Sequence, residues 1–223
     1  IGATRSTSNF GDMAYFSGMG PTFDYRFKPD VSAPGYVTYS SNAVPNAQSC
    51  RLTGKAGTSM ATPAAAGNGA IIRQFFVDSS YWAASCNSGY ALCGAFNPRG
   101  ATVKAALIHS GEPMEEYPGG DTETQITLGT APDMMQGFGR VTLSNVLPLT
   151  GTTVTGFDLF VDELSMTSYT TQTYTVTVTD STAPLKVTIA WMDPPADSLS
   201  TKVLIHDLDL KVIAPGGAVS YGN

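Results

Sequence analysis

The sequence predicts an α/β domain over residues 1–148, followed by an incomplete antiparallel β-barrel or sandwich module over residues 149–223. In the first part, short strand-like runs alternate with two apolar helical segments, which is typical of a parallel sheet covered by helices. Beyond about Pro148, apolar residues recur at every second position and no helical pattern is visible, which indicates half-buried antiparallel strands. This change of period places the boundary within a few residues of Gly151.

Residues 1–56 are expected to form short strands and turns. Strands are predicted at Ala14–Phe16 and Val37–Tyr39, and a polar hairpin around Asn42–Gln48. A buried helix is predicted over Thr58–Phe76, because small residues are followed by aliphatic ones. Pro63 falls in its first turn, where the missing N–H of proline costs nothing.

A second helix is predicted over Asn97–His109, with Asn97 as its cap and Pro98 at its first position. Its apolar face is expected to pack against the sheet, and consists of Val103, Ala106, Leu107 and Ile108. The segment Glu115–Asp133 is polar and is predicted to be a surface loop.

The second module is expected to hold three strands. Alternating apolar residues indicate strands at Thr173–Thr179 and at Leu185–Trp191. Leu208, Leu210 and Val212 are expected to form the core side of a third strand.

Composition excludes some classes of function. The chain has 223 residues, of which 42% are hydrophobic, so it can bury a sizeable core. Its net charge of −6 is unfavourable for a nucleic-acid partner, because phosphate binding needs a basic surface. Abundant Thr, Ser and Gly together with only 13% charged residues suit a secreted or extracytoplasmic β-rich protein. No signal peptide or membrane segment is visible, but the chain begins at Ile1 inside an expected strand and both ends look cut, which predicts a fragment.

Two of the three cysteines lie in one connection, Trp82–Phe96. Cys86 and Cys93 are close enough in the sequence for a local disulfide that would staple this loop. Cys50 is then left over, either paired with a residue outside this sequence or present as a buried thiol. Three reduced cysteines are the alternative.

Ser59 is the main candidate for chemistry. It lies at the start of the predicted apolar helix, at the positive end of the helix dipole and beside free N–H groups. An oxyanion formed by attack on a carbonyl would be stabilised there. The local pattern alone favours a serine that caps a core helix, since Ser is a preferred cap.

The run Gly57–Pro63 (GTSMATP) resembles the nucleophile motif of the subtilisin-like serine proteases. Phe16–Pro21 and Lys28–Gly35 are similar to two further motifs of that family, in the same order, and Gly137–Val141 resembles a motif near the end of its domain. The likeness covers about residues 1–145 and implies a subtilisin-like parallel-sheet catalytic domain.

The likeness extends into the second module. Val187–Pro195 and Asp207–Leu210 resemble the C-terminal β-barrel of the KP-43-like branch of the family, and related enzymes bind calcium in this module. Asp207 and Asp209 would project from one face of a strand, about 7 Å apart, and calcium prefers such oxygen ligands. A solvated polar face beside Lys211 is the alternative, and His206 stands where relatives often carry Asn.

The resemblance implies a serine endopeptidase that acts on polypeptides and carries an N-terminal propeptide outside this sequence. In that family the catalytic Asp, His and Ser follow one another in this order, so both partners of Ser59 would precede it, outside the given chain. Ser59 would be the nucleophile, and its backbone N–H one donor of the oxyanion hole. We therefore expect the isolated 223 residues to be inert and the parent protein to be active.

The other titratable candidates are interpreted as structural. His109 and His206 lie after Ser59, as a base would in an α/β-hydrolase, but that fold requires glycine where this chain has Ala61. His109 ends the second helix, where the dipole favours a cation. Asp30 belongs to a motif in which the resemblance implies a structural role.

Two other functions remain open. The protein is alternatively a catalytically inactive subtilase homologue that acts as a binding or scaffold module. The third possibility is that the β module mainly binds a partner or substrate and the protease positions this module.

Overall fold

The computed structural model describes residues 1–6, 11–43, 51–86, 88–118, 125–149 and 158–222. Its helices are α1 (Thr58–Val77), α2 (Trp82–Ser85) and α3 (Gly100–His109), with a 3₁₀ turn at Leu143–Asn145. Its strands are β1 (Gly2–Arg5), β2 (Ser32–Tyr36), β3 (Thr38–Ser41), β4 (Leu52–Lys55), β5 (Gly111–Glu112), β6 (Glu116–Pro118), β7 (Gln125–Thr127), β8 (Arg140–Val141), β9 (Lys211–Ile213) and β10 (Val219–Tyr221).

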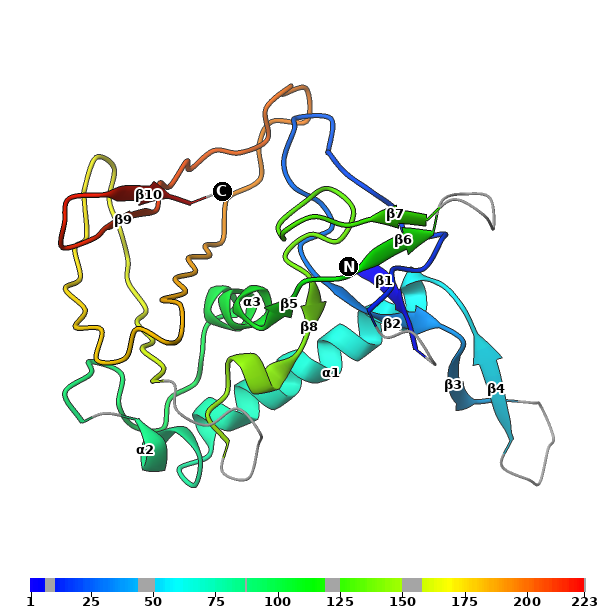
Figure 1. Cartoon of the computed structure of the whole chain (residues 1–223), viewed down its shortest axis with the longest axis horizontal. Coiled ribbons are helices and arrows are strands. Elements are labelled where there is room, and N and C mark those ends of the chain that lie inside the picture. Colours follow the sequence, from blue (N-terminus) through cyan, green and yellow to red (C-terminus); the bar gives the residue numbers. More distant parts are fainter. Residues whose placement is uncertain (7–10, 44–50, 87, 119–124, 150–157, 223) are drawn as a thin grey trace.

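A small, mostly parallel sheet lies at the centre of the molecule. Its strands follow the order β1-β2-β8-β5, in which β2 is parallel to both β1 and β8 and β5 is antiparallel to β8. The helix α1 crosses the molecule beside this sheet, with α3 next to it (Figure 1). The predicted α/β arrangement with a parallel sheet is therefore confirmed.

The helix α1 packs against the sheet with its N-terminal half and against aromatic side chains with its C-terminal half. Near the sheet, Ala61 and Ala65 lie in a cluster with the buried alanines of β1 and β2, so helix and strands approach closely. Farther along, Ile72, Phe75 and Phe76 form the larger core. The predicted helix over Thr58–Phe76 is confirmed and ends one residue later.

The start of α3 differs from the prediction. The helix begins at Gly100, after Arg99 in the cap position, so Asn97 is not its cap and Pro98 is not its first residue. The carboxylate of Glu163 accepts the Arg99 N–H at 2.7 Å and thereby supplies the capping oxygen from another part of the chain. The end at His109 agrees with the prediction.

Two predictions for the loops around the sheet are wrong. No strand forms at Ala14–Phe16; instead single bridges pair Met13 with Thr4 and Asp12 with Glu116, just before that segment. The expected surface loop Glu115–Asp133 contains the β6–β7 hairpin. Its Tyr117 is buried in a cluster with Met13 and Met114, and the phenol O–H donates to the carbonyl oxygens of Tyr15 and Ser17, at 3.2 and 3.1 Å.

The expected polar hairpin is confirmed where it is described. The strands β3 and β4 pair antiparallel from Thr38 with Lys55 to Ser41 with Leu52. Residues 44–50 at its tip, including Cys50, lie outside the described residues. The expected disulfide is confirmed, because Cys86 and Cys93 are bonded with their Cα atoms 5.5 Å apart.

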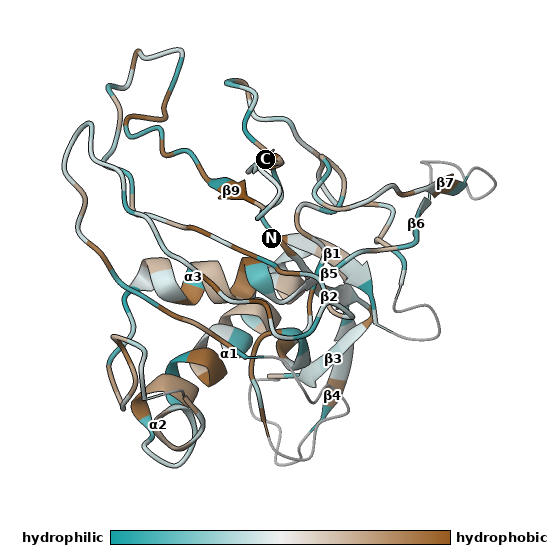
Figure 2. Cartoon of the chain, turned by 60° about the vertical axis from the view of Figure 1, so that its left-hand side comes forward, coloured by the Kyte–Doolittle hydropathy of each residue, from teal (hydrophilic) through white to brown (hydrophobic). Residues whose placement is uncertain are grey.

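The described C-terminal residues 158–222 do not form a closed barrel. Ladder pairing there is confined to the hairpin of β9 and β10, so the strands predicted at Thr173–Thr179 and Leu185–Trp191 are absent, and the third is shorter than expected and begins at Lys211. The alternation is present in the sequence, yet a strand also needs a neighbour for its backbone hydrogen bonds. Figure 2 draws much of the molecule outside the labelled elements as coil that carries both brown and teal stretches. Val176 and Val178 accordingly remain 57% and 55% exposed.

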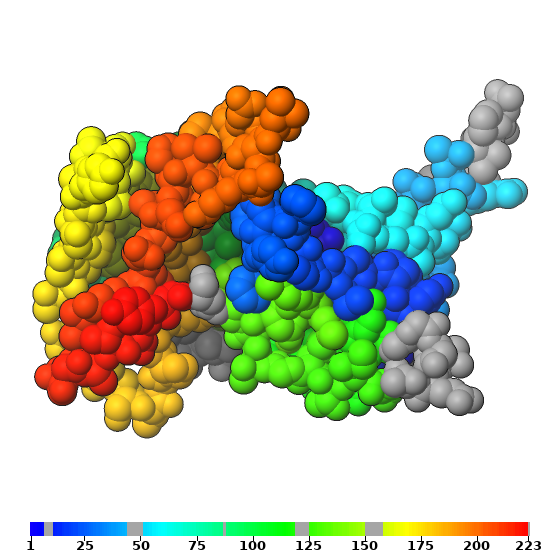
Figure 3. All heavy atoms as spheres, turned by 90° about the horizontal axis from the view of Figure 1, so that it is seen from above, coloured from blue at the N-terminus to red at the C-terminus, as the bar shows by residue number. Residues whose placement is uncertain are grey.

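The C-terminal residues gather on one side of the molecule. In Figure 3 they form the yellow-to-red side, while the blue and green residues of the first part lie opposite. In the part of the chain that is described, no helix is both long and apolar enough to cross a membrane.

Candidate active site

The helix α1 begins at the carboxyl end of β2. The Gly57 N–H donates to the carbonyl oxygen of Gly35 at 2.8 Å, which fixes the helix start beside the sheet edge. Gly57 has φ of 154°, a backbone conformation that residues with a side chain rarely adopt. In α/β sheets, ligands bind outside the carboxyl ends of the strands, so this edge is the expected place for a site.

Ser59 is the second residue of α1 and is exposed. The cap position is occupied by Gly57, and no side chain caps the helix, so the interpretation of Ser59 as a capping serine is wrong. Within the described residues, neither its hydroxyl nor its backbone N–H makes a hydrogen bond. Its N–H is therefore a free donor at the positive end of a 20-residue helix.

The motifs around Ser59 hold the sheet edge in place. The Ser17 hydroxyl accepts the Ala3 N–H at 3.0 Å, and the Ser32 hydroxyl donates to the Gln136 carbonyl oxygen at 3.1 Å. A Cβ atom at Gly35 would lie 2.8 Å from both the Ala3 Cβ and the Gly57 carbonyl oxygen. Glycine at position 35 thus allows the strands and α1 to meet.

The two glycines of Gly137–Val141 likewise allow two stretches of backbone to approach closely. A Cβ atom at Gly137 would lie 2.1 Å from the Pro29 carbonyl oxygen, and one at Gly139 would lie 2.2 Å from that of Glu112. Both glycines also have positive φ, of 64° and 98°. The backbone of this motif therefore passes directly against the neighbouring chain.

Gln136 was not singled out from the sequence, although it lies directly before that motif. Its side chain is fully buried and accepts the Met114 N–H at 2.6 Å while donating to the Asp133 carboxylate at 2.6 Å. Buried polar groups need such partners. The only sequence signal was its position beside Gly137, because glutamine itself indicates no role.

The two histidines lie in other surroundings than Ser59. The Nδ1 atom of His109 is 3.0 Å from the Thr188 hydroxyl oxygen. Burial, and next the positive charge of Lys186, lower the pKa of His109 to about 4, so the ring is neutral at pH 7. The interpretation of His109 as a helix-end residue agrees with this, but its expected role as the cation there belongs to Lys186.

His206 is exposed and pairs with Asp193, with 3.0 Å between Nδ1 and Oδ1. Within the described residues, neither His206 nor His109 makes a hydrogen bond to Ser59. A general base for Ser59 is therefore not supplied by these two side chains in this arrangement.

Asp30 is ion-paired and lies just before β2. Its carboxylate is 2.5 Å from the Lys28 ammonium and 3.7 Å from that of Lys104. Burial raises its pKa, but the Lys28 hydrogen bond and the nearby positive charges outweigh this, so the pKa of Asp30 is lowered. These contacts fit a structural role.

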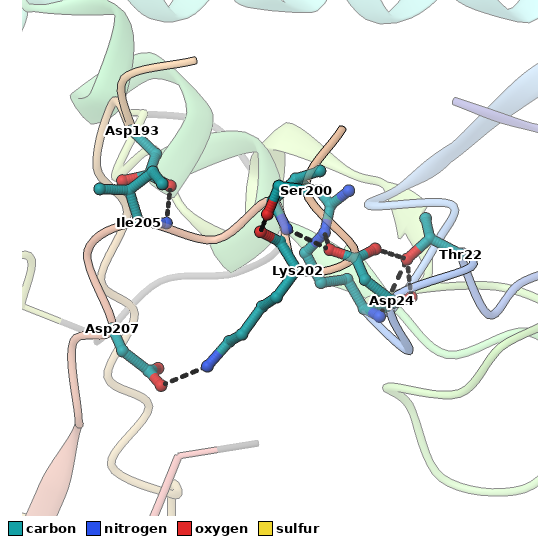
Figure 4. A network of polar contacts seen from close by, with 9 residues as sticks. Thr22, Asp24, Asp193, Ser200, Lys202, Ile205 and Asp207 are labelled. Carbon is teal, nitrogen blue, oxygen red and sulfur yellow. Dashed lines mark hydrogen bonds and ion pairs between the residues drawn. The ribbon is translucent and has the colours of Figure 1, made fainter. Parts of the chain in front are cut away.

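Asp207 and Asp209 precede β9 and do not lie on one face of a strand. The Asp207 carboxylate is 3.4 Å from the Lys202 ammonium (Figure 4). Across the described residues, no three His, Cys, Asp or Glu side chains gather as metal ligands. Since calcium takes six to eight oxygen ligands, the two carboxylates alone fit it poorly.

The same figure shows a connection that the sequence analysis missed. The Asp24 carboxylate accepts bonds from the Thr22 hydroxyl at 2.6 Å, from Arg26 Nε at 2.8 Å and from the Val203 N–H at 3.2 Å. The Arg26 and Thr22 bonds hold its pKa well below the usual range. Asp24 thus joins the loop after the 16–21 motif to the C-terminal part, and no local pattern indicates a partner 179 residues away.

Comparison with known families agrees with the motifs. The model of the subtilase family matches residues 1–139, a region that contains β1, β2, β5, α1 and Ser59. The chain belongs to the subtilase family.

Three curated proteins of Dictyostelium discoideum are similar to the chain. The serine protease/ABC transporter B family protein tagA is 29% identical over 217 residues, which cover 89% of this chain and 11% of that protein. The family proteins tagD and tagB are 28% and 26% identical, and the matches cover 91% and 92% of this chain and 13% of each relative. The chain thus spans about an eighth or less of the length of these relatives.

Proposed function

We propose that the protein is a serine endopeptidase in which Ser59 attacks the carbonyl carbon of a peptide bond. The observation that carries the proposal is the exposed serine at the start of α1, beside the carboxyl end of β2, with its own N–H free. A capping serine would use its hydroxyl on the helix backbone, whereas this hydroxyl is available. Membership of the subtilase family supports a serine protease-like function.

In the proposed mechanism, a histidine takes the Ser59 proton and an aspartate orients that histidine. Both would precede residue 1, in the order Asp, His, Ser that this family uses. The Ser59 N–H would donate to the oxyanion of the tetrahedral intermediate. One such donor is worth about 10²–10³ in kcat.

The 223 residues by themselves would lack two triad members and are proposed to be inactive. In subtilisin, which is a relative and not this protein, enzymes without triad residues retain only about 10³–10⁴-fold rate enhancement over water. The activity is therefore assigned to the parent protein, which we further propose to be secreted or extracytoplasmic and to be made with a propeptide. The Cys86–Cys93 disulfide supports an oxidising compartment.

Hydrolysis of casein by the parent protein tests the proposal. Ser59→Ala is expected to abolish turnover, because the nucleophile is removed. Ser79→Ala is the matched control, since Ser79 is an exposed serine just beyond the other end of α1. Equal activity of Ser59→Ala and the wild type would refute the proposal, and no hydrolysis by a folded wild type would favour the inactive homologue.

The finer assignments are proposals as well. The KP-43-like branch, with modules at residues 1–148 and 149–223, is supported by the motifs Val187–Pro195 and Asp207–Leu210. Calcium binding at Asp207 and Asp209 is the least supported, because the Lys202 ammonium lies 3.4 Å from one of the two carboxylates. Isothermal titration with calcium tests it, and Asp207→Asn with Asp209→Asn should then remove one binding site.

A further inference from the structure

The C-terminal part touches both ends of α3. At the N-terminal end, the Glu163 carboxylate accepts the Arg99 N–H at 2.7 Å and the Thr102 hydroxyl, and it lies 3.3 Å from Arg99 Nε. The first N–H groups of a helix have no partner inside it and carry partial positive charge. Glu163 therefore satisfies a free donor and places a negative charge where the helix favours one.

At the C-terminal end of α3, a lysine side chain contacts the last carbonyl groups of the helix. The Lys186 ammonium donates to the carbonyl oxygen of His109, the last residue of the helix, and to that of Gly111 at 3.4 Å. The last carbonyls of a helix lack internal partners and carry partial negative charge. Each end of α3 thus receives from residues 158–190 the charge that its dipole favours.

The two contacts are independent of each other. A helix of 10 residues is about 15 Å long, whereas the chain between Glu163 and Lys186 could span several times that distance when extended. The chain between them loops away and returns (Figure 1). Connectivity alone therefore does not bring both residues to α3.

A third contact lies on the disulfide loop. Tyr90, between Cys86 and Cys93, has its ring 5.0 Å from that of Phe160 and its hydroxyl 2.5 Å from the Asp158 carboxylate. Residues 158–190 form no ladder with a neighbouring strand. Side-chain contacts must therefore hold this segment to the first part.

We propose that residues 158–190 are a strap that fastens α3 onto α1, with Glu163 and Lys186 as its two fasteners. Val103 and Leu107 of α3 pack against the apolar cluster that Ile72, Phe75 and Phe76 of α1 form. The strap adds to this packing, because Leu159 and Val161 contact the same cluster and the two fasteners bind both termini of α3 from outside. This role is separate from the chemistry of Ser59.

Hydrogen exchange of α3 in the full-length protein, read on peptides from 97–110, and limited proteolysis within 158–190 together test the strap. The variants are Glu163→Gln, which removes the charge but keeps the shape, and Lys186→Met, which keeps the apolar stem. Lys211→Met is the matched control, because Lys211 is an exposed lysine of β9 in the same part of the chain. All readouts are independent of protease activity.

Each fastener variant is expected to accelerate exchange in 97–110 about tenfold or more, as loss of a charge-assisted hydrogen bond predicts, and to speed proteolytic cleavage within 158–190. Lys211→Met should leave both readouts unchanged. Unchanged exchange in both fastener variants would overturn the proposal. Faster exchange in α3 without faster cleavage in 158–190 would overturn it too, because the strap would then not depend on its fasteners.

Discussion

Replacement of Gly35 by alanine is expected to move the start of α1, which carries Ser59. The new Cβ atom would lie 2.8 Å from the Ala3 Cβ, 2.8 Å from the Gly57 carbonyl oxygen and 3.1 Å from the Ala61 Cβ. Ordinary contacts of this kind begin at 3.4 Å. The backbone of β1 or the first turn of α1 must therefore give way by about half an ångström, since none of these atoms ends a flexible side chain.

The magnitude follows from this displacement. Overpacking of a close-packed site costs about 1–3 kcal/mol, and a shift of 1 Å at a catalytic group can cost about 10²-fold in rate. For half that shift, we expect Gly35→Ala to lower kcat about tenfold and the free energy of unfolding by about 1–3 kcal/mol. KM should change less, because the position of Ser59 is altered rather than the substrate surface.

Gly67→Ala is the matched control for this substitution. Gly67 lies in α1 with no atom within 4 Å of a Cβ, and it is exposed. There alanine should stabilise the helix by up to about 1 kcal/mol, because glycine is the poorer helix former. Peptide hydrolysis and denaturant unfolding of the parent protein measure both variants. Wild-type kcat and stability in Gly35→Ala would refute the close approach of α1 to the sheet.

Two further predictions concern stability. The pKa of His109 is about 4 in the folded state and near 6.5 in the unfolded state, so the unfolded state binds more protons between these pH values. The free energy of unfolding should therefore fall by about 1–2 kcal/mol from pH 6.5 to 4, after allowance for partial exposure. Denaturant unfolding should show a smaller loss in His109→Gln, and the same pH dependence of stability in both proteins would contradict the assignment. Replacement of Cys86 and Cys93 by serine should lower the free energy of unfolding by roughly 2–3 kcal/mol for so short a loop and should speed hydrogen exchange around Tyr90 and Phe160. An unchanged free energy of unfolding would show that the disulfide does not stabilise the fold.

Local signals predicted the central parts of the structure. The helix α1 followed from small residues, aliphatic residues and an early proline, and all of these lie within about 20 residues of one another. The disulfide followed from the spacing of Cys86 and Cys93 in one loop. Ser59 was placed at the helix start because its motif is local as well.

The errors arose where a partner lies far away in the sequence. The start of α3 was misplaced because Glu163, rather than Asn97, satisfies the free N–H group. Tyr117 was assigned to a surface loop because its hydrogen-bond acceptors lie about 100 residues earlier. The strands expected at 173–191 had the right side-chain alternation, but alternation does not supply a hydrogen-bonding neighbour.

The most direct test of the central claim is labelling of the mature parent protein by a fluorophosphonate, with the adduct located by mass spectrometry. We predict a single adduct on Ser59, retained in Ser79→Ala and absent from Ser59→Ala, because only an activated serine reacts with such a probe. A folded, propeptide-free protein that takes no label, or takes it at another residue, would contradict the assignment of Ser59 as the nucleophile.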